Sequence, residues 1–227
     1  ELDNTDLIIL PGSKNTILDL RYLQKSRIAE KLRFLMGQVW ILGICGGFQM
    51  LGLSVEDPLN MESTKINEKI NKAGKYDNLL ELENHELSSI YKDSNRELGL
   101  GILEMTTVLQ GDKKLIRREY KGKNLLEGLN WQGYEIHLGR SDFDKFKYEE
   151  LVKDGNELAI IDHHKKVIGT YIHGWFESSE VTQKILALVS SETFKIPFSF
   201  RETKEREMND LALFLEEHCE VEKILKN

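Results

Sequence analysis

Cys45, within the sequence Gly-Ile-Cys-Gly-Gly of residues 43–47, is the side chain best suited to covalent chemistry. It follows an apolar run, residues 39–44, and precedes a helix-forming stretch, residues 48–51. A G-x-C-x-G turn between a strand and a helix is the cysteine version of a nucleophile elbow, in which flanking side chains would collide with neighbouring backbone. The positive end of the helix should favour the thiolate and direct the Gly46 N–H at an oxyanion. A buried structural cysteine is the alternative.

A cysteine nucleophile needs a base, and His173 is the strongest candidate among the six histidines. It ends a strand-like run, residues 167–173, and precedes Gly174. Its side chain would therefore lie at the carboxyl edge of a sheet, where open α/β sheets bind ligands. A histidine that only completes the strand end is the alternative.

The other five histidines are weaker candidates for the base. His163 and His164 are expected in a hairpin turn, and a metal pair is less favoured because no nearby residues complete a ligand set. His85, in a polar segment, and His218, on a terminal helix, are expected at the surface. His137 is retained as a candidate substrate contact.

The loop Leu-Pro-Gly-Ser-Lys-Asn-Thr at residues 10–16 ends the first predicted strand. Gly-Ser-Lys invites comparison with a phosphate-binding loop, but the first glycine of that motif is absent and the order is wrong. We expect Gly12 instead to bring its backbone N–H toward Cys45, as the second donor of an oxyanion hole.

The predicted elements around these motifs alternate between strand and helix. Strands are expected at residues 6–10 and 39–44, and a helix at 17–36, capped by Asn15 or Thr16 and stopped by Gly37. Such a βαβ unit implies a parallel sheet. Further along, we expect a polar excursion at 57–91, strands at 98–103, 105–109, 133–138 and 167–173, and helices from 179 and over 211–225.

Composition excludes several functional classes. The 227 residues carry 31 basic and 38 acidic side chains, a net charge of -7, without a basic stretch that interleaves aromatics, so nucleic-acid binding is not expected. Lys113, Lys114, Arg117 and Arg118 are interpreted as a solvated face. Two cysteines form no disulfide framework, and no apolar run approaches the roughly 20 residues that span a bilayer. A soluble cytoplasmic protein is expected.

Several segments together resemble a known family. They are LPGSKNT at 10–16, GICGGFQMLG at 43–52, EDP at 56–58, LGLGIL at 98–103, GYEIHLG at 133–139 and GTYIHGWF at 169–176. In this order, and over nearly the whole chain, they resemble the class I, triad-type glutamine amidotransferase domains of cobyric acid synthases. The resemblance implies an α/β fold with a flavodoxin-like open, mostly parallel sheet and helices on both faces.

The resemblance also implies roles for particular residues. Cys45 would attack the glutamine amide and form a glutamyl thioester, with His173 as base and then acid. Gly12 and Gly46 would supply the oxyanion hole.

Substrate-binding roles are implied for Gln49, Glu135 and His137. Many triad glutaminases place a glutamate two residues after the histidine, but here that position is Trp175. Glu177 is then the nearest acidic candidate for orienting His173, unless no carboxylate does so.

In the resembling enzymes an ATP-dependent synthetase domain and a first glutaminase strand precede this region. We therefore expect residues 1–227 to be one glutamine amidotransferase domain that lacks both. The domain itself would need no cofactor or metal, whereas ATP and Mg belong to the synthetase domain. Glutamine, that synthetase domain and, through it, a corrinoid would be the partners in cobalamin biosynthesis.

Three other interpretations stay open. One is the amidotransferase subunit that works with a cell-wall ligase on lipid II, against which the GSKNT loop and GYEIHLG argue. Another is a peptidase-like cysteine-elbow hydrolase, which would not need His173. The third is a non-catalytic binding domain that keeps the elbow as architecture, and glutamine turnover would separate it from the enzymes.

Overall fold

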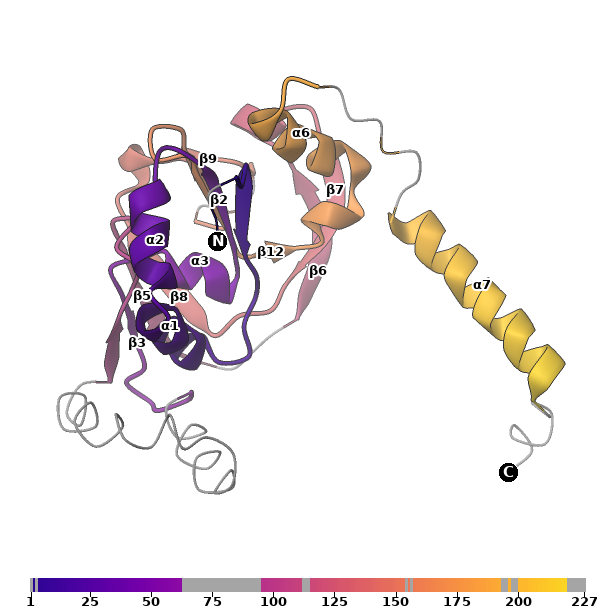
Figure 1. Cartoon of the computed structure of the whole chain (residues 1–227), viewed down its shortest axis with the longest axis horizontal. Helices are drawn as coiled ribbons and strands as arrows, with labels where there is room; N and C mark the ends of the chain where they lie inside the picture. Colours follow the sequence, from indigo (N-terminus) through magenta and orange to yellow (C-terminus); the bar gives the residue numbers. More distant parts are fainter. Residues whose placement is uncertain are drawn as a thin grey trace. The chain divides into compact units, whose positions relative to one another are not determined.

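The computed structural model describes residues 2, 4–62, 95–111, 115–153, 155, 157–192, 196 and 200–219 (Figure 1). The chain forms two compact units, Glu1–His173 and Gly174–Asn227. Most of the predicted polar excursion at 57–91, with His85, lies outside the described residues, as do Lys113 and Lys114.

The central sheet of the first unit has the order β1-β2-β11-β10-β9. Its strands are β1 (Leu7–Leu10), β2 (Trp40–Ile44), β11 (Val167–Thr170), β10 (Ala159–Asp162) and β9 (Glu149–Glu150). β2 pairs in parallel with both β1 and β11, which confirms the predicted βαβ unit. β10 is antiparallel to β11 because a tight turn at 163–166 joins them, as predicted for His163 and His164.

The helix predicted at 17–36 is wrong as a single element. The structure has α1 (Thr16–Lys25) and α2 (Ile28–Leu35), separated at Ser26 and Arg27 (Figure 1). Arg27 has a left-handed φ of 61°, and the Ser26 hydroxyl donates to the Tyr22 carbonyl at 2.7 Å. A side-chain bond to the preceding turn competes with helix continuation, and the apolar spacing alone did not reveal it.

The ends of this helical segment follow the predicted signals. Asn15 is the N-cap, since its Oδ1 accepts from the Leu18 N–H at 2.8 Å. Gly37, with φ of 78°, follows the second helix. Leu20 and Leu32 are fully buried and anchor the two helices in the hydrophobic core.

A second sheet has the order β4-β3-β5-β8, with β4 (Arg96–Leu98), β3 (Ser54–Glu56), β5 (Met105–Leu109) and β8 (Gly139–Phe143). β5 confirms the prediction at 105–109. The strand predicted at 98–103 is wrong, because β4 ends at Leu98 and the next residues turn back against the loop after α3 (Gly46–Met50). The N–H groups of Leu100 and Ile102 donate there to the carbonyls of Met50 and Leu51.

The third sheet, β12-β7-β6, is antiparallel and consists of β12 (Ile172–His173), β7 (Asn130–Glu135) and β6 (Ile116–Lys121). The predicted continuous strand at 167–173 is therefore broken between β11 and β12. Tyr171 causes the break: its N–H donates to the Leu158 carbonyl at 2.7 Å, and its side chain is buried. The strand predicted at 133–138 also shifts, since β7 ends at Glu135.

The α/β class is confirmed, with sheets more mixed than predicted. Among the described strands, three pairs are parallel, β1 with β2, β2 with β11 and β3 with β5, and the other pairs are antiparallel. Short 3-10 helices, η1 (Asn124–Leu126) and η2 (Lys145–Lys147), lie in connections of the first unit.

The second unit contains η3 (Trp175–Glu177), α6 (Ser179–Val189) and α7 (Phe200–His218). α6 confirms the helix predicted from residue 179, and Ser178 caps it by accepting from the Val181 N–H. The last helix begins at Phe200, earlier than predicted. Across the described parts of both units, no helix combines the length and apolarity needed to cross a membrane.

Candidate active site

Cys45 has the strained backbone of a nucleophile elbow. It lies between β2 and α3 with φ of 52° and ψ of -108°, and its N–H donates to the Thr170 carbonyl of β11 at 2.7 Å. The Cys45 side chain is buried. The predicted strand–turn–helix geometry is confirmed. A non-glycine residue rarely has a positive φ unless the surrounding packing holds it there.

The elbow glycines are required by close backbone contacts. A Cβ on Gly43 would lie 2.8 Å from both the Gly47 carbonyl oxygen and the Phe48 Cα. A Cβ on Gly47 would overlap the Leu10 carbonyl oxygen. The strand, the elbow and the loop after β1 are thus packed too closely for side chains at these positions.

Cys45, His173 and Gly12 converge at one point. A Cβ built on Gly12 would lie 3.6 Å from the Cys45 Cβ and 3.0 Å from the His173 Cε1. Among the described residues, no acceptor for the N–H of Gly12 or of Gly46 is found. This arrangement has the parts of a thiol catalyst, with a nucleophile, an imidazole and two backbone donors.

His173 is held by the third sheet rather than by the central one. It pairs with Tyr134 across β12 and β7, and the two rings stack with centroids 4.9 Å apart and planes 8° apart. The stack fixes the plane of the imidazole. Glu177 belongs to η3 of the second unit, and its role as the partner of His173 stays a prediction.

A pocket opens beside the thiol. The Cys45 Sγ lies 3.5 Å from the Ile136 carbonyl oxygen. The lining residues of this pocket are Ser13, Thr16, Cys45, Gly46, Gln49, Glu62, Leu109, Ile136, His137 and Leu138.

Gln49 lines the pocket from α3 with a buried side chain. Its Oε1 accepts a hydrogen bond from the Thr16 hydroxyl at 3.1 Å, which ties α3 to the start of α1. Gly139 leaves room for the amide, because a Cβ there would lie 3.0 Å from the Gln49 Cδ. Gln49 is thus positioned as predicted for a substrate contact, and that role stays a prediction.

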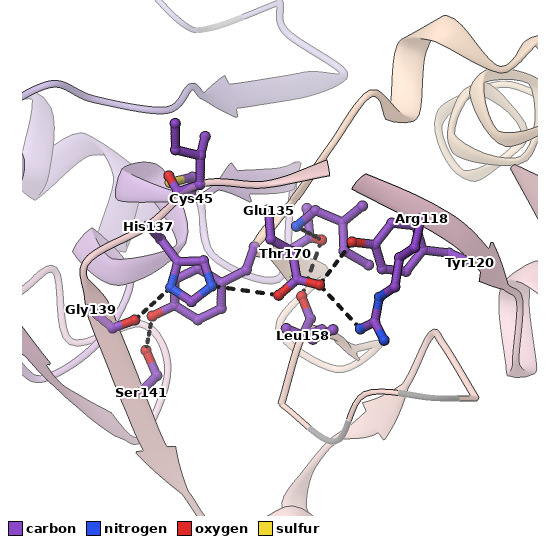
Figure 2. A network of polar contacts seen from close by, with 12 residues as sticks. Cys45, Arg118, Tyr120, Glu135, His137, Gly139, Ser141, Leu158 and Thr170 are labelled. Carbon is purple, nitrogen blue, oxygen red and sulfur yellow. Dashed lines mark hydrogen bonds and ion pairs between the residues drawn. The ribbon is translucent and has the colours of Figure 1, made fainter. Parts of the chain in front are cut away.

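Figure 2 shows that Glu135 lies between two groups of side chains. Its Oε1 accepts from Arg118 Nη2 at 3.1 Å and from the Tyr120 hydroxyl at 2.8 Å, and its Oε2 lies 3.7 Å from His137 Nε2. His137 Nδ1–H donates to the Gly139 carbonyl at 2.7 Å. Only His137 of this chain of contacts lines the pocket.

The Glu135 carboxylate is kept ionised by its partners. Burial acts to raise its pKa, but the contacts from His137 and Tyr120 and the charge of Arg118 outweigh burial and hold the pKa below the ordinary value. Burial also raises the pKa of Tyr120 to about 12, so its hydroxyl remains a donor. The ionised Glu135 carboxylate can therefore form an ion pair with His137, whose Nε2 lies 3.7 Å from Oε2, when that ring is protonated.

Sequence reasoning missed Arg118 and Tyr120. The interpretation of Arg118 as part of a solvated face is wrong, because its guanidinium pairs with Glu135. Arg118 and Tyr120 are two residues apart in β6, so both side chains lie on the same face of the strand. This spacing could have indicated from the sequence that the two side chains contact a common partner. Their facing partner depended on the β6–β7 register, which the sequence does not reveal.

His163 and His164 lie in the turn between β10 and β11. His163 meets the edge of the Trp40 ring and lies 3.9 Å from a Glu149 carboxylate oxygen. Throughout the described ranges, no group of three or more His, Cys, Asp or Glu residues is placed to hold a metal ion.

Comparisons with known proteins agree with this geometry. The model of the CobB/CobQ-like glutamine amidotransferase domain family matches residues 1–181. A cobyric acid synthase of Streptococcus sanguinis is 34% identical over 96% of this chain and 40% of its own length, and one of Clostridium novyi is 32% identical over 99% and 41%. This chain thus spans about 40% of the length of these relatives. A crystal structure of a glutamine amidotransferase has a similar fold, with a TM-score of 0.55 and 15% identity over 83% of this chain and 81% of that one.

Proposed function

The chain belongs to the CobB/CobQ-like glutamine amidotransferase family, and from that premise we propose that Cys45 hydrolyses glutamine through a thioester to supply ammonia. The observation that supports this most strongly is the convergence of the strained Cys45 elbow, the His173 ring and the Gly12 loop. A purely architectural elbow would not need the His173 imidazole and the Cys45 side chain to lie against the same glycine of the loop after β1.

Each of these groups has a role in the proposed reaction. His173 takes the proton of the Cys45 thiol, and the resulting thiolate attacks the side-chain amide carbon of glutamine. The N–H groups of Gly12 and Gly46 donate to the resulting oxyanion. His173 gives a proton to the amide nitrogen, the C–N bond breaks, and ammonia leaves a glutamyl thioester. His173 then takes a proton from water, which attacks the thioester and releases glutamate and the free thiol.

The fate of the ammonia is proposed from the relatives. Those that the chain matches are named cobyric acid synthases, and the chain spans about 40% of their length. We propose that a synthetase domain using ATP and Mg accepts the ammonia to amidate corrinoid carboxylates in cobalamin biosynthesis. Such a domain would be the partner of this one.

Glutamate release from glutamine tests the proposed chemistry. Cys45→Ala should abolish it while leaving the melting temperature nearly unchanged, because the elbow glycines and their contacts remain. Turnover retained by a folded Cys45→Ala protein would disprove the assignment.

The same assay examines the base. His173→Asn should reduce the rate by about 10²- to 10⁴-fold, as expected for loss of a general acid–base group. His163→Asn is the matched control, since His163 lies in the β10–β11 turn, and it should cost little. Equal losses in both variants would rule out His173 as the specific base.

A further inference from the structure

Glu62 is the one acidic side chain among the described residues that line the Cys45 pocket. The roles proposed for Cys45, His173 and the oxyanion donors leave Glu62 without a function in the reaction. Only 6% of Glu62 is exposed to solvent. A carboxylate buried to this extent beside a nucleophile is costly unless it meets donors or a cation.

Three hydrogen bonds help to hold Glu62 in place. Its Oε2 accepts from the Ile17 N–H at 3.1 Å, in the first turn of α1. Its backbone N–H donates to Asp57 Oδ2 at 3.0 Å, and its carbonyl accepts from Asn15 Nδ2 at 3.2 Å. The carboxylate is therefore preorganised, which reduces the entropic cost of binding a ligand to it.

The start of α1 connects Glu62 to the elbow. A Cβ on Gly46 would lie 2.9 Å from the Ser13 Cβ and 3.2 Å from the Thr16 Oγ1, so the loop before α1 packs directly on the residue after Cys45. Ile17, which donates to Glu62, is the next residue of the same turn. A ligand whose amide reaches the thiol would extend its other end along lining residues that include Glu62.

We propose that Glu62 binds the α-ammonium group of glutamine and thereby selects glutamine among primary amides. This inference rests on the proposed glutaminase function. The α-ammonium is the only cationic group of glutamine, and charge-assisted hydrogen bonds to a carboxylate are roughly twice as strong as neutral ones. The competing explanation gives Glu62 only the structural task of satisfying an N–H at the start of α1.

The labelling rate of Cys45 separates these explanations. Two probes are compared by mass spectrometry: a glutamine-like diazo ketone that carries the α-amino group, and the same ketone without it. The unmodified protein should react about 10- to 100-fold faster with the amino form at sub-saturating concentration. Equal rates would overturn the inference without any variant.

Glu62→Gln keeps an acceptor for Ile17 but removes the charge. It should slow labelling by the amino probe about 10- to 100-fold and leave the rate with the des-amino probe nearly unchanged, so the ratio falls toward one. A purely structural role would slow both probes together. A ratio kept at the value of the unmodified protein would contradict the proposal.

Glu97→Gln is the matched control, because Glu97 is also a buried carboxylate but pairs with Arg21 and does not line the pocket. Its ratio of rates should equal that of the unmodified protein. Absence of Cys45 labelling by either probe would count against the glutaminase proposal itself, whereas labelling without selectivity would count against Glu62 alone.

Discussion

Cys45 combines a positive φ of 52° with a buried thiol. A non-glycine residue in such a conformation costs about 1–3 kcal/mol, so the surrounding contacts must hold it there. Those contacts are backbone ones: the Cys45 N–H to Thr170, and the Gly47 N–H to the Pro11 carbonyl at 3.1 Å. Main-chain contacts thus position Cys45 on both sides, which leaves its side chain available for the proposed reaction.

Glu135 gives a prediction about acid stability. Its pKa in the folded protein is below the ordinary glutamate value of 4.5, so the unfolded chain takes up a proton first as the pH falls. The stability that the ionised carboxylate contributes is complete well above pH 4.5 and is lost as the pH drops through the folded pKa. Glu135→Gln should cost about 1–2 kcal/mol at pH 7 and progressively less below pH 4.5.

Urea unfolding of both proteins at several pH values measures this difference. A gap between the unmodified protein and Glu135→Gln that stays constant from pH 7 to below pH 4.5 would contradict the charge-based role. It would mean that the contacts with Arg118 and Tyr120 stabilise the fold independently of the charge on Glu135.

At the scale of elements, the elbow depends on the fit between β2, α3 and the loop after β1. Gly47→Ala should destabilise the protein by about 3 kcal/mol or more, because the new methyl group overlaps main chain that cannot move freely. Gly101→Ala is the control: a Cβ there meets nothing within 4 Å, although φ is 68°, so only about 1–2 kcal/mol is expected. Chemical denaturation compares them, and equal losses would argue against close packing at the elbow.

Elements with strong local signals were predictable. β1 and β2 are short apolar runs closed by Pro-Gly or by the elbow, and the elbow motif itself is encoded in consecutive residues. The break at Tyr171 was not predictable, because it follows from the burial of that side chain, whose hydroxyl lies 2.6 Å from the Ser141 Oγ. As a result, the sequence analysis predicted His173 at the end of a strand, but not that this end forms a separate strand paired with β7.

The candidate site also contains residues that were predictable from local sequence and residues that were not. Cys45, Gly12 and Gly46 follow from local backbone rules, whereas the contacts of Glu135 with Arg118 and Tyr120 depend on the pairing of β6 with β7. Glu62 gave no local signal, because its burial in the pocket depends on contacts with residues 15 and 17, far away in the sequence.

At the scale of the whole molecule, the residues of the proposed chemistry belong to the first compact unit. Cys45, His173, Gly12 and every lining residue of the pocket lie within Glu1–His173. The family match at residues 1–181 covers this unit and extends only into α6 of the second. The second cysteine, Cys219, is exposed and follows α7, so one protein offers both a candidate nucleophile and an internal reference thiol.

The most direct test of the account is mass spectrometry of the intact chain after incubation with a glutamine-like diazo ketone. We predict a single adduct on Cys45 that glutamine suppresses by competition, with Cys219 unmodified despite its exposure. Labelling at Cys219 in preference to Cys45, or labelling of Cys45 that glutamine does not reduce, would contradict the assignment of a glutamine-specific thiol.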